Sequence, residues 1–230
     1  MEYNETVALT FASSGSVYTD FATSIIDISL RRKNIVANII TENGPYITIN
    51  RNMIVAKFLQ TDIDWMFCFD TDIIISIKDF DIMIDAANKD THPVLGGKYF
   101  LSIFDGYSNK IRVSGQLPNS DNNKPTDQGK WIEDYPEDSI IDGLWNMGMG
   151  YVLIHRSVLE KIVKDNPDDP YPWFKQEYRS DPYGWITEDV WFYEQVRNSG
   201  FNIAMHTGAS SRHINKLEIT EENFKNDKNI

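Results

Sequence analysis

Cysteine, basic charge and long apolar runs are all scarce in this chain. Cys68 is the one cysteine among 230 residues, so a disulfide within the chain is excluded. No apolar stretch approaches the roughly 18 to 20 residues that span a bilayer, and residues 1–5 lack the basic and then apolar form of a secretion signal. These absences predict a soluble chain that stays in the cytoplasm and has no membrane partner.

Basic residues are outnumbered by acidic ones. Twenty-two Lys and Arg against 34 Asp and Glu leave a formal net charge of −12. This charge opposes non-specific binding to a phosphate backbone, so nucleic acid is a possible but unfavoured partner. The clear basic cluster, at residues 31–33, follows a predicted helix, where it is explained equally well by the helix dipole or by a binding role.

The remaining composition is that of a folded protein. Apolar residues make up 41% and aromatic residues 13% of a chain long enough to bury a full core. We expect a single domain over residues 1–230, with a polar tail at about 218–230.

Apolar patterning in the first part of the chain predicts alternating strands and helices. The expected elements are a strand over residues 7–11, a small-residue loop over 12–16, a helix over 18–30, a strand over 35–40, a helix over about 50–60 and a strand over 65–69. A βαβαβ unit of this kind predicts an α/β fold with a mainly parallel sheet flanked by helices.

The rest of the chain is less regular. We expect a helix near residues 79–88, strands over 93–97, 150–155 and 201–205, a short helix over 158–163 and a helix over 188–198. The polar region 105–138 has no strong period and many turn residues, which predicts a long binding loop or flap.

The strand over residues 65–69 is wholly apolar and stops on Asp70-Thr71-Asp72. Five apolar residues without alternation are typical of a strand buried on both faces, and ligands collect at the carboxyl ends of such strands. Two carboxylates this close repel each other unless a hard cation intervenes, so a Mg²⁺ or Mn²⁺ site for a phosphorylated ligand is indicated. A solvated acidic loop or a helix N-cap are the plainer readings, and the same spacing recurs at residues 62–64 and 79–81.

Four segments in a fixed order resemble one known architecture. They are Arg51-Asn52, Phe69-Asp70-Thr71-Asp72, the run from Gly148 to Ile154, and Thr187-Glu188-Asp189, with His213 following the last strand. Over roughly residues 5–215 the chain resembles the GT-A glycosyltransferases, and most closely the small single-domain enzymes of bacteriophages and large DNA viruses. The resemblance implies a GT-A, Rossmann-like sheet and a nucleotide-sugar donor, with a UDP-sugar as first choice and a GDP-sugar as second.

The resemblance also implies a metal centre that holds Mn²⁺ or Mg²⁺. Asp72 matches the direct ligand, Asp70 matches the residue that contacts the ribose or reaches the metal through water, and His213 matches the late histidine of the metal shell. His206 is the nearby competitor of His213. A bound cation stabilises the charge that develops on the departing nucleoside diphosphate.

Catalytic and donor residues follow from the same match. Asp189 is expected as the general base of an inverting transfer and Glu188 as an acceptor or sugar ligand, although the two roles could be exchanged. The remaining expected donor contacts are Ala12, Ser13 and Ser14 at the nucleobase, Arg51 at a phosphate or the base, and Met147 and Gly148 at the donor sugar. Trp185, just before Glu188, is expected at the acceptor.

The expected function is transfer of a hexosyl or pentosyl group from a nucleotide sugar to a hydroxyl acceptor. The acceptor could be a glycan, a protein-linked glycan or a modified base of viral DNA, and the acidic charge slightly favours the first two. Two other classes compete: a sugar-nucleotide nucleotidyltransferase and a non-catalytic carbohydrate-binding module. The first of these would carry a basic residue in the loop after the first strand, and residues 12–16 contain no Lys or Arg.

Overall fold

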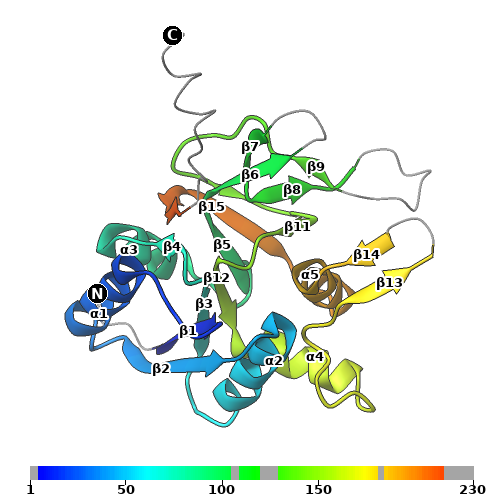
Figure 1. Cartoon of the computed structure of the whole chain (residues 1–230), viewed down its shortest axis with the longest axis horizontal. Helices are drawn as coiled ribbons and strands as arrows, with labels where there is room; N and C mark the ends of the chain where they lie inside the picture. The colour runs from blue at the N-terminus through cyan, green and yellow to red at the C-terminus, as the bar shows by residue number, and fades with distance from the viewer. Residues whose placement is uncertain (1–4, 105–108, 120–128, 181–183, 215–230) are drawn as a thin grey trace, which may run out of the picture.

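A seven-stranded sheet forms the centre of the molecule (Figure 1). The computed structural model describes residues 5–104, 109–119, 129–180 and 184–214. The predicted polar tail lies outside these residues. In spatial order the strands are β10 (Ile140–Ile141), β15 (Ile203–Ser210), β5 (Val94–Lys98), β12 (Tyr151–His155), β3 (Trp65–Phe69), β1 (Val7–Ser13) and β2 (Val36–Asn43).

Five of these strands run in one direction, and β12 and β10 run in the other. The first three strands along the chain, β1, β2 and β3, pair in parallel, as expected of a βαβαβ unit. The mixed, mainly parallel α/β sheet predicted from the sequence is therefore confirmed.

Helices cover both faces of the sheet. Phe21 of α1 (Thr19–Arg31) and Phe80 of α3 (Ile77–Ala86) belong to one buried cluster. The other face carries α2 (Ile47–Phe58), α4 (Arg156–Asp165) and α5 (Glu188–Asn198), whose buried side chains form the second cluster (Figure 1). Within β3, Phe67 packs in the first cluster and Met66 in the second, which explains why this strand is apolar without alternation.

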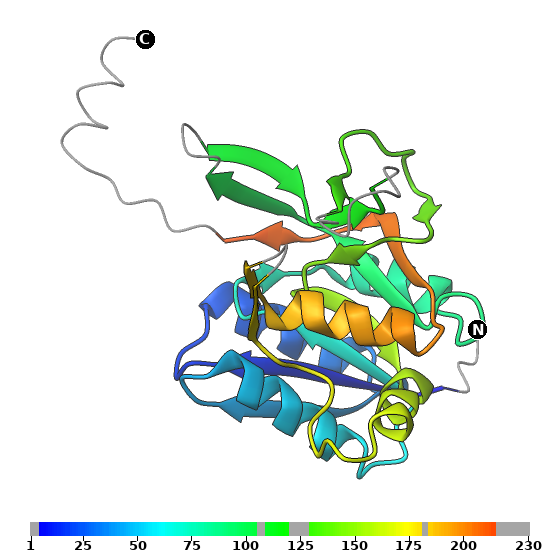
Figure 2. The ribbon, with the colours of Figure 1, turned by 90° about the vertical axis from the view of Figure 1, so that its right-hand side faces the viewer.

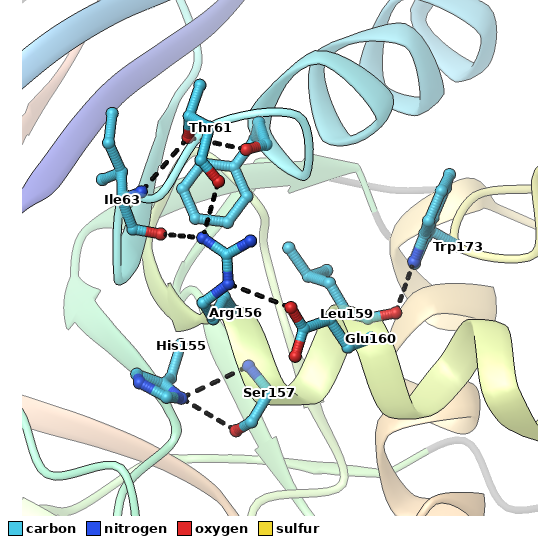
Figure 3. A network of polar contacts seen from close by, with 9 residues as sticks. Thr61, Ile63, His155, Arg156, Ser157, Leu159, Glu160 and Trp173 are labelled. Atoms are coloured by element: carbon cyan, nitrogen blue, oxygen red, sulfur yellow. Dashed lines mark hydrogen bonds and ion pairs between the residues drawn. The ribbon is translucent and has the colours of Figure 1, made fainter.

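A polar network fixes the start of α4 against the loop that leads into β3 (Figure 3). Nη1 of Arg156 donates to the backbone carbonyls of Thr61, at 3.0 Å, and Ile63, at 2.5 Å. Nε1 of Trp173 donates to the carbonyl of Leu159 at 3.0 Å and so holds the segment after α4 onto that helix. The bonds from Arg156 satisfy loop carbonyls that no strand or helix pairs, and they fix the start of α4 at the end of β3 that lies away from the site described below.

The prediction of a long loop over residues 105–138 is wrong for part of that region. Strand β6 (Phe100–Phe104) pairs with β7 (Asn109–Val113), and β8 (Gly115–Leu117) pairs with both β9 (Lys130–Trp131) and β11 (Asn146–Met147). Figure 2 shows the β6–β7 hairpin standing above the main sheet. Strands of two to five residues are too short to show a period, and β11 lies far along the chain from its partner β8.

Other boundaries move by a few residues. Helix α2 begins at Ile47 rather than near residue 50, and β15 continues to Ser210 rather than ending at residue 205. The basic cluster at residues 31–33 lies at the end of α1, where Arg31 pairs with Asp27 at 2.7 Å. Within the described residues, no helix is long and apolar enough to cross a membrane.

Candidate active site

A cleft of about 360 Å³ opens at the carboxyl ends of β1 and β3. These strands pair in parallel, with Phe11 opposite Phe69, so the residues that follow each strand come out at the same edge of the sheet. The cleft is lined by Ala12, Ser13, Ser14, Gly44, Pro45, Ile47, Asn50, Arg51, Asp70, Thr71, Asp72 and Glu188. Residues 12–14 and 51, 70, 72 and 188 were expected at one site from the sequence, and the structure brings them together.

A short turn directs the two aspartates of the acidic motif. The amide of Asp70 donates to the carbonyl of Gly150 at 3.1 Å, and the amide of Ile73 donates back to the carbonyl of Asp70 at 3.1 Å. An added Cβ at Gly150 would lie 2.9 Å from Oδ2 of Asp70, so a larger residue there would displace this carboxylate. The turn therefore places both carboxylates at the end of β3.

His213 reaches this turn through a two-strand pair. Strand β16 (Arg212–His213) pairs antiparallel with β4 (Ile73–Ile74), so that His213 lies opposite Ile73. Nε2 of His213 is 3.5 Å from Oδ2 of Asp72, and this contact with Asp72 raises the pKa of His213 above its ordinary value. The competitor His206 lies instead in β15, opposite Ile140 of β10, where its Nδ1 accepts from the amide of Gly208 at 3.1 Å.

The second nitrogen of His213 is held by the backbone. Nδ1 lies 2.8 Å from the carbonyl oxygen of Phe100, which can only accept a hydrogen bond. Nδ1 is therefore the protonated nitrogen in the neutral ring, and Nε2 presents its lone pair toward Asp72. Metal-bound histidines are oriented by this kind of second hydrogen bond.

Arg51 occupies the centre of the cleft wall. Its Nη2 lies 2.8 Å from Oδ1 of Asp70 and its Nη1 lies 2.9 Å from Oε1 of Glu188. Burial by itself lowers the pKa of Arg51, but Asp70 and Glu188 outweigh this effect, so that the pKa lies above its ordinary value. Within the described residues, no group of three or more His, Cys, Asp and Glu side chains converges on one point where a metal could sit. Asp70 instead points to a guanidinium.

Glu188 and Asp189 are neighbours at the start of α5 but differ in their partners. Both oxygens of Glu188 are engaged, Oε1 with Arg51 and Oε2 with Nε2 of Gln176 at 2.9 Å. Oδ1 of Asp189 accepts from the hydroxyl of Thr187 and from the amide of Val190. Burial raises the pKa of Asp189 above its ordinary value, although the hydrogen bond from Thr187 partly offsets this.

The segment before β13 is fixed by Asn52, the neighbour of Arg51 on α2. The side-chain Nδ2 of Asn52 donates to the backbone carbonyl of Phe174 at 2.8 Å. The side-chain Oδ1 of Asn52 accepts from the backbone N–H of Phe174 at 3.1 Å. The Phe174 ring lies 5.9 Å from the Arg51 guanidinium, and Gln176 reaches Glu188 from the same segment. Sequence analysis paired Asn52 with Arg51 in a motif but did not predict this structural role.

The loop after β2 forms another wall of the cleft, which the sequence analysis did not predict. The side-chain amide of Asn50 donates to the carbonyl of Gly44 at 2.9 Å, and the amide of Gly44 donates to the carbonyl of Ser13 at 2.9 Å. These bonds tie this loop to the end of β1. The Asn43-Gly44-Pro45 run is a strong turn signal after a strand and could have been used to find this wall.

Two expected donor-sugar contacts are not among the cleft-lining residues. The Met147 side chain is 4% exposed and packs in the core against Gly96, while Gly148 lies against the hydroxyl of Tyr99. The Met147 side chain is therefore turned into the core and not into the cleft, and the sequence pattern gave no sign of this orientation of β11. Trp185 of β14 (Gly184–Ile186) is 71% exposed and lies 6.2 Å, edge to face, from Tyr178 of β13 (Glu177–Arg179).

Comparison with solved structures identifies this arrangement of sheet and helices. A197 from STIV superposes with a TM-score of 0.60 and 17% identity, over 92% of this chain and 86% of that one. GalNAc-T7, solved with UDP, GalNAc and Mn²⁺, superposes with a TM-score of 0.53 and 10% identity, over 93% of this chain and 44% of that one. The chain has the GT-A fold.

The GT-A likeness is one of structure, since no family model and no curated protein matches the sequence. This chain spans less than half of GalNAc-T7. The inositol-1-phosphate CTP transferase from T. maritima is more distant, with a TM-score of 0.48 and 12% identity over 98% of this chain and 96% of that one. At these identities the comparisons establish the fold alone.

Proposed function

We propose that this chain is a metal-dependent glycosyltransferase that moves a sugar from a nucleotide-sugar donor to a hydroxyl acceptor with inversion. The observation that carries the proposal is a cleft at the carboxyl edge of the GT-A sheet. It is lined by the small-residue loop after β1, the Asp70-Thr71-Asp72 turn and Glu188 at the start of α5. The GT-A fold of GalNAc-T7, which was solved with UDP, GalNAc and Mn²⁺, supports the same reading.

The side-chain oxygen and nitrogen atoms around Asp72 are suitable ligands for a hard or borderline divalent cation. Asp72 offers carboxylate oxygens, and His213 offers an Nε2 lone pair that its bond to Phe100 directs toward Asp72. Two protein ligands leave positions for water and for diphosphate oxygens, as Mn²⁺ and Mg²⁺ sites of phosphorylated ligands require. When bound, the cation would supply Lewis-acid stabilisation of the leaving diphosphate.

The chain's own groups divide the remaining work. Residues 12–14 form a wall of the cleft that would meet the nucleobase, and Asp70 and Arg51, which are paired with each other, line the same cleft. Asp189 is the better general base of the two acids, because burial raises its pKa and its Oδ2 has no hydrogen-bond partner within the described residues. It would take the proton from the acceptor hydroxyl as that oxygen attacks the anomeric carbon.

The acceptor side is assigned to the β13–β14 hairpin. Trp185 and Tyr178 face solvent on this hairpin, and its neighbour Gln176 is bonded to Glu188 at the cleft. Aromatic faces suit the apolar surface of a sugar ring, so a glycan or protein-linked glycan is the proposed acceptor, met in the cytoplasm.

Calorimetry tests the proposal directly. The chain should bind UDP-sugars, or failing those GDP-sugars, only in the presence of Mn²⁺ or Mg²⁺, and should slowly hydrolyse the bound donor when no acceptor is present. Asp72→Ala should abolish the metal-dependent binding, while Asp62→Ala, an exposed acid of a similar Asp-x-Asp pair, should leave it unchanged.

The same experiment separates the competing classes. Metal-dependent binding without any donor hydrolysis would indicate a carbohydrate-binding module. Release of pyrophosphate from a nucleoside triphosphate and a sugar phosphate would indicate a nucleotidyltransferase. A transferred sugar that keeps the configuration of the donor would contradict inversion.

A further inference from the structure

Arg51 links two acids of the cleft, Asp70 of the proposed metal-binding turn and Glu188 at the start of α5. It is 13% exposed and lies between Asp70, at 2.8 Å, and Glu188, at 2.9 Å. Its guanidinium also lies over the Phe174 ring, which Asn52 holds in place by two backbone hydrogen bonds. The Arg51 side chain is therefore fixed by contacts on several sides and is not free to follow a ligand.

The contact with Arg51 has a consequence for Asp70. Its Oδ1 is turned toward Arg51, and its Oδ2 lies on the side of Gly150. Asp72, two residues later, is turned instead toward His213. The two carboxylates of one short motif thus point to two different partners, one a guanidinium that is always charged and the other an imidazole nitrogen.

We propose that Arg51 is a positioning residue, which turns Asp70 away from a metal held by Asp72 and His213 and fixes Asp70 relative to Glu188. This inference rests on the proposed function, because it concerns the same metal. It explains why the described acids and histidines do not form a cluster of three metal ligands.

Arginine suits this task better than lysine. Its planar guanidinium offers separate N–H groups to two carboxylates at once, as Nη1 and Nη2 do here, whereas lysine is a point charge. Because Gln176 holds the other oxygen of Glu188, the chain of contacts fixes Asp70 and Glu188 relative to each other. Arg51 therefore positions both Glu188 and Asp70.

The test is the affinity for Mn²⁺ alone, measured by the loss of the free-ion signal in electron paramagnetic resonance. Arg51→Met removes a positive charge beside the metal and releases Asp70, so the affinity for Mn²⁺ should rise by about tenfold or more. Replacing Asp70 by Asn in the Arg51→Met background should remove most of that gain. Arg51→Lys keeps the charge but cannot hold both carboxylates in the same way, so its Mn²⁺ affinity should lie between those of the unsubstituted chain and of Arg51→Met.

Arg156→Met is the matched control. Arg156 is also a partly buried arginine in a fixed network, but its partners are Thr61, Ile63 and Glu160 (Figure 3). This variant should lose thermal stability without any change in Mn²⁺ affinity. Should Arg51→Met not fold, Arg51→Gln removes the charge while keeping a hydrogen-bonding group, and the same gain is expected.

An unchanged or weaker Mn²⁺ affinity in a folded Arg51→Met or Arg51→Gln variant overturns the inference and leaves the proposed function standing. If the unsubstituted chain shows no Mn²⁺ binding that depends on Asp72, the proposed function fails and the inference fails with it.

Discussion

At the scale of single residues, Asp189 and Glu188 show how two adjacent acids can acquire different chemistry. Glu188 is held by Arg51 and Gln176 through both oxygens, which favours a fixed carboxylate. Asp189 is half-buried and its pKa is raised by desolvation, which favours a group that accepts and releases a proton. The sequence left their roles exchangeable, and these surroundings favour the assignment of Asp189 as base.

Asp189→Asn should lower the turnover of transfer by roughly 10²- to 10⁴-fold and leave donor affinity nearly unchanged, because a general base acts in the transition state. An acid whose pKa is raised on folding destabilises the fold once the pH exceeds the unfolded pKa of about 3.9. Asp189→Asn removes this cost, so at pH 7 its melting temperature should equal or exceed that of the parent.

Calorimetry, steady-state kinetics and thermal melts of the same preparation check all three outcomes. Glu188→Gln serves as the control, since it should disturb the Arg51 contact and lower stability. Normal transfer by Asp189→Asn, with slow transfer by Glu188→Gln, would move the base by one residue.

His213 should make Mn²⁺ binding depend on pH. A protonated ring cannot ligate, and Asp72 raises the pKa of His213 above its ordinary value of about 6.5. Mn²⁺ affinity should therefore begin to fall while the pH is still above 6.5 and continue to fall as the pH decreases. His213→Ala should bind weakly without this pH dependence, and His206→Ala should behave as the unsubstituted chain. Loss of the dependence in His206→Ala would identify the other histidine as the ligand.

At the scale of elements, α2 supplies two adjacent residues with separate duties. Arg51 faces the cleft, and Asn52, which is 7% exposed, holds the backbone of Phe174. Removal of a buried polar group leaves its partners unpaired, so Asn52→Ala should lower the free energy of unfolding by about 1–3 kcal/mol. Urea denaturation measures this change. Asn166→Ala, at the less buried end of α4, should cost less, and equal losses in the two variants would argue against the bridging role of Asn52.

The elements also show what the sequence could predict. The apolar run of β3, the helix at residues 188–198 and the acidic turn after Phe69 carry local signals, and the structure places them as expected. The β4–β16 pair, which brings His213 close to Asp72, has two residues in each strand and so leaves no periodic pattern in the sequence. Arg51 contacts a residue 19 positions away and another 137 positions away, which no local pattern encodes. The strands near residues 100–131 were missed for the same reason, since tertiary pairing rather than periodicity defines them.

At the scale of the whole molecule, the sheet determines the position of the cleft, and the net charge affects which acceptor can approach it. The seven-stranded GT-A sheet brings the ends of β1 and β3 together and so forms the cleft that we propose for the nucleotide sugar. The net charge of −12 bears instead on the acceptor. A polyanion approaching this surface meets repulsion that a neutral glycan does not.

We therefore expect the full chain to bind duplex DNA less tightly than the 10⁻⁴ to 10⁻⁶ M that is typical of non-specific binders at physiological salt. Fluorescence anisotropy with a labelled duplex, at low and physiological salt, measures this affinity. A neutral oligosaccharide offered with a nucleotide-sugar donor should be a better acceptor than DNA. Trp185→Ala should weaken transfer to this oligosaccharide while hydrolysis of the donor continues. The reason is that Trp185 does not line the donor cleft and is exposed on the hairpin. Duplex binding in the micromolar range that weakens steeply with salt would instead point to counterion release from a local basic surface, and a modified base of DNA would become the better acceptor.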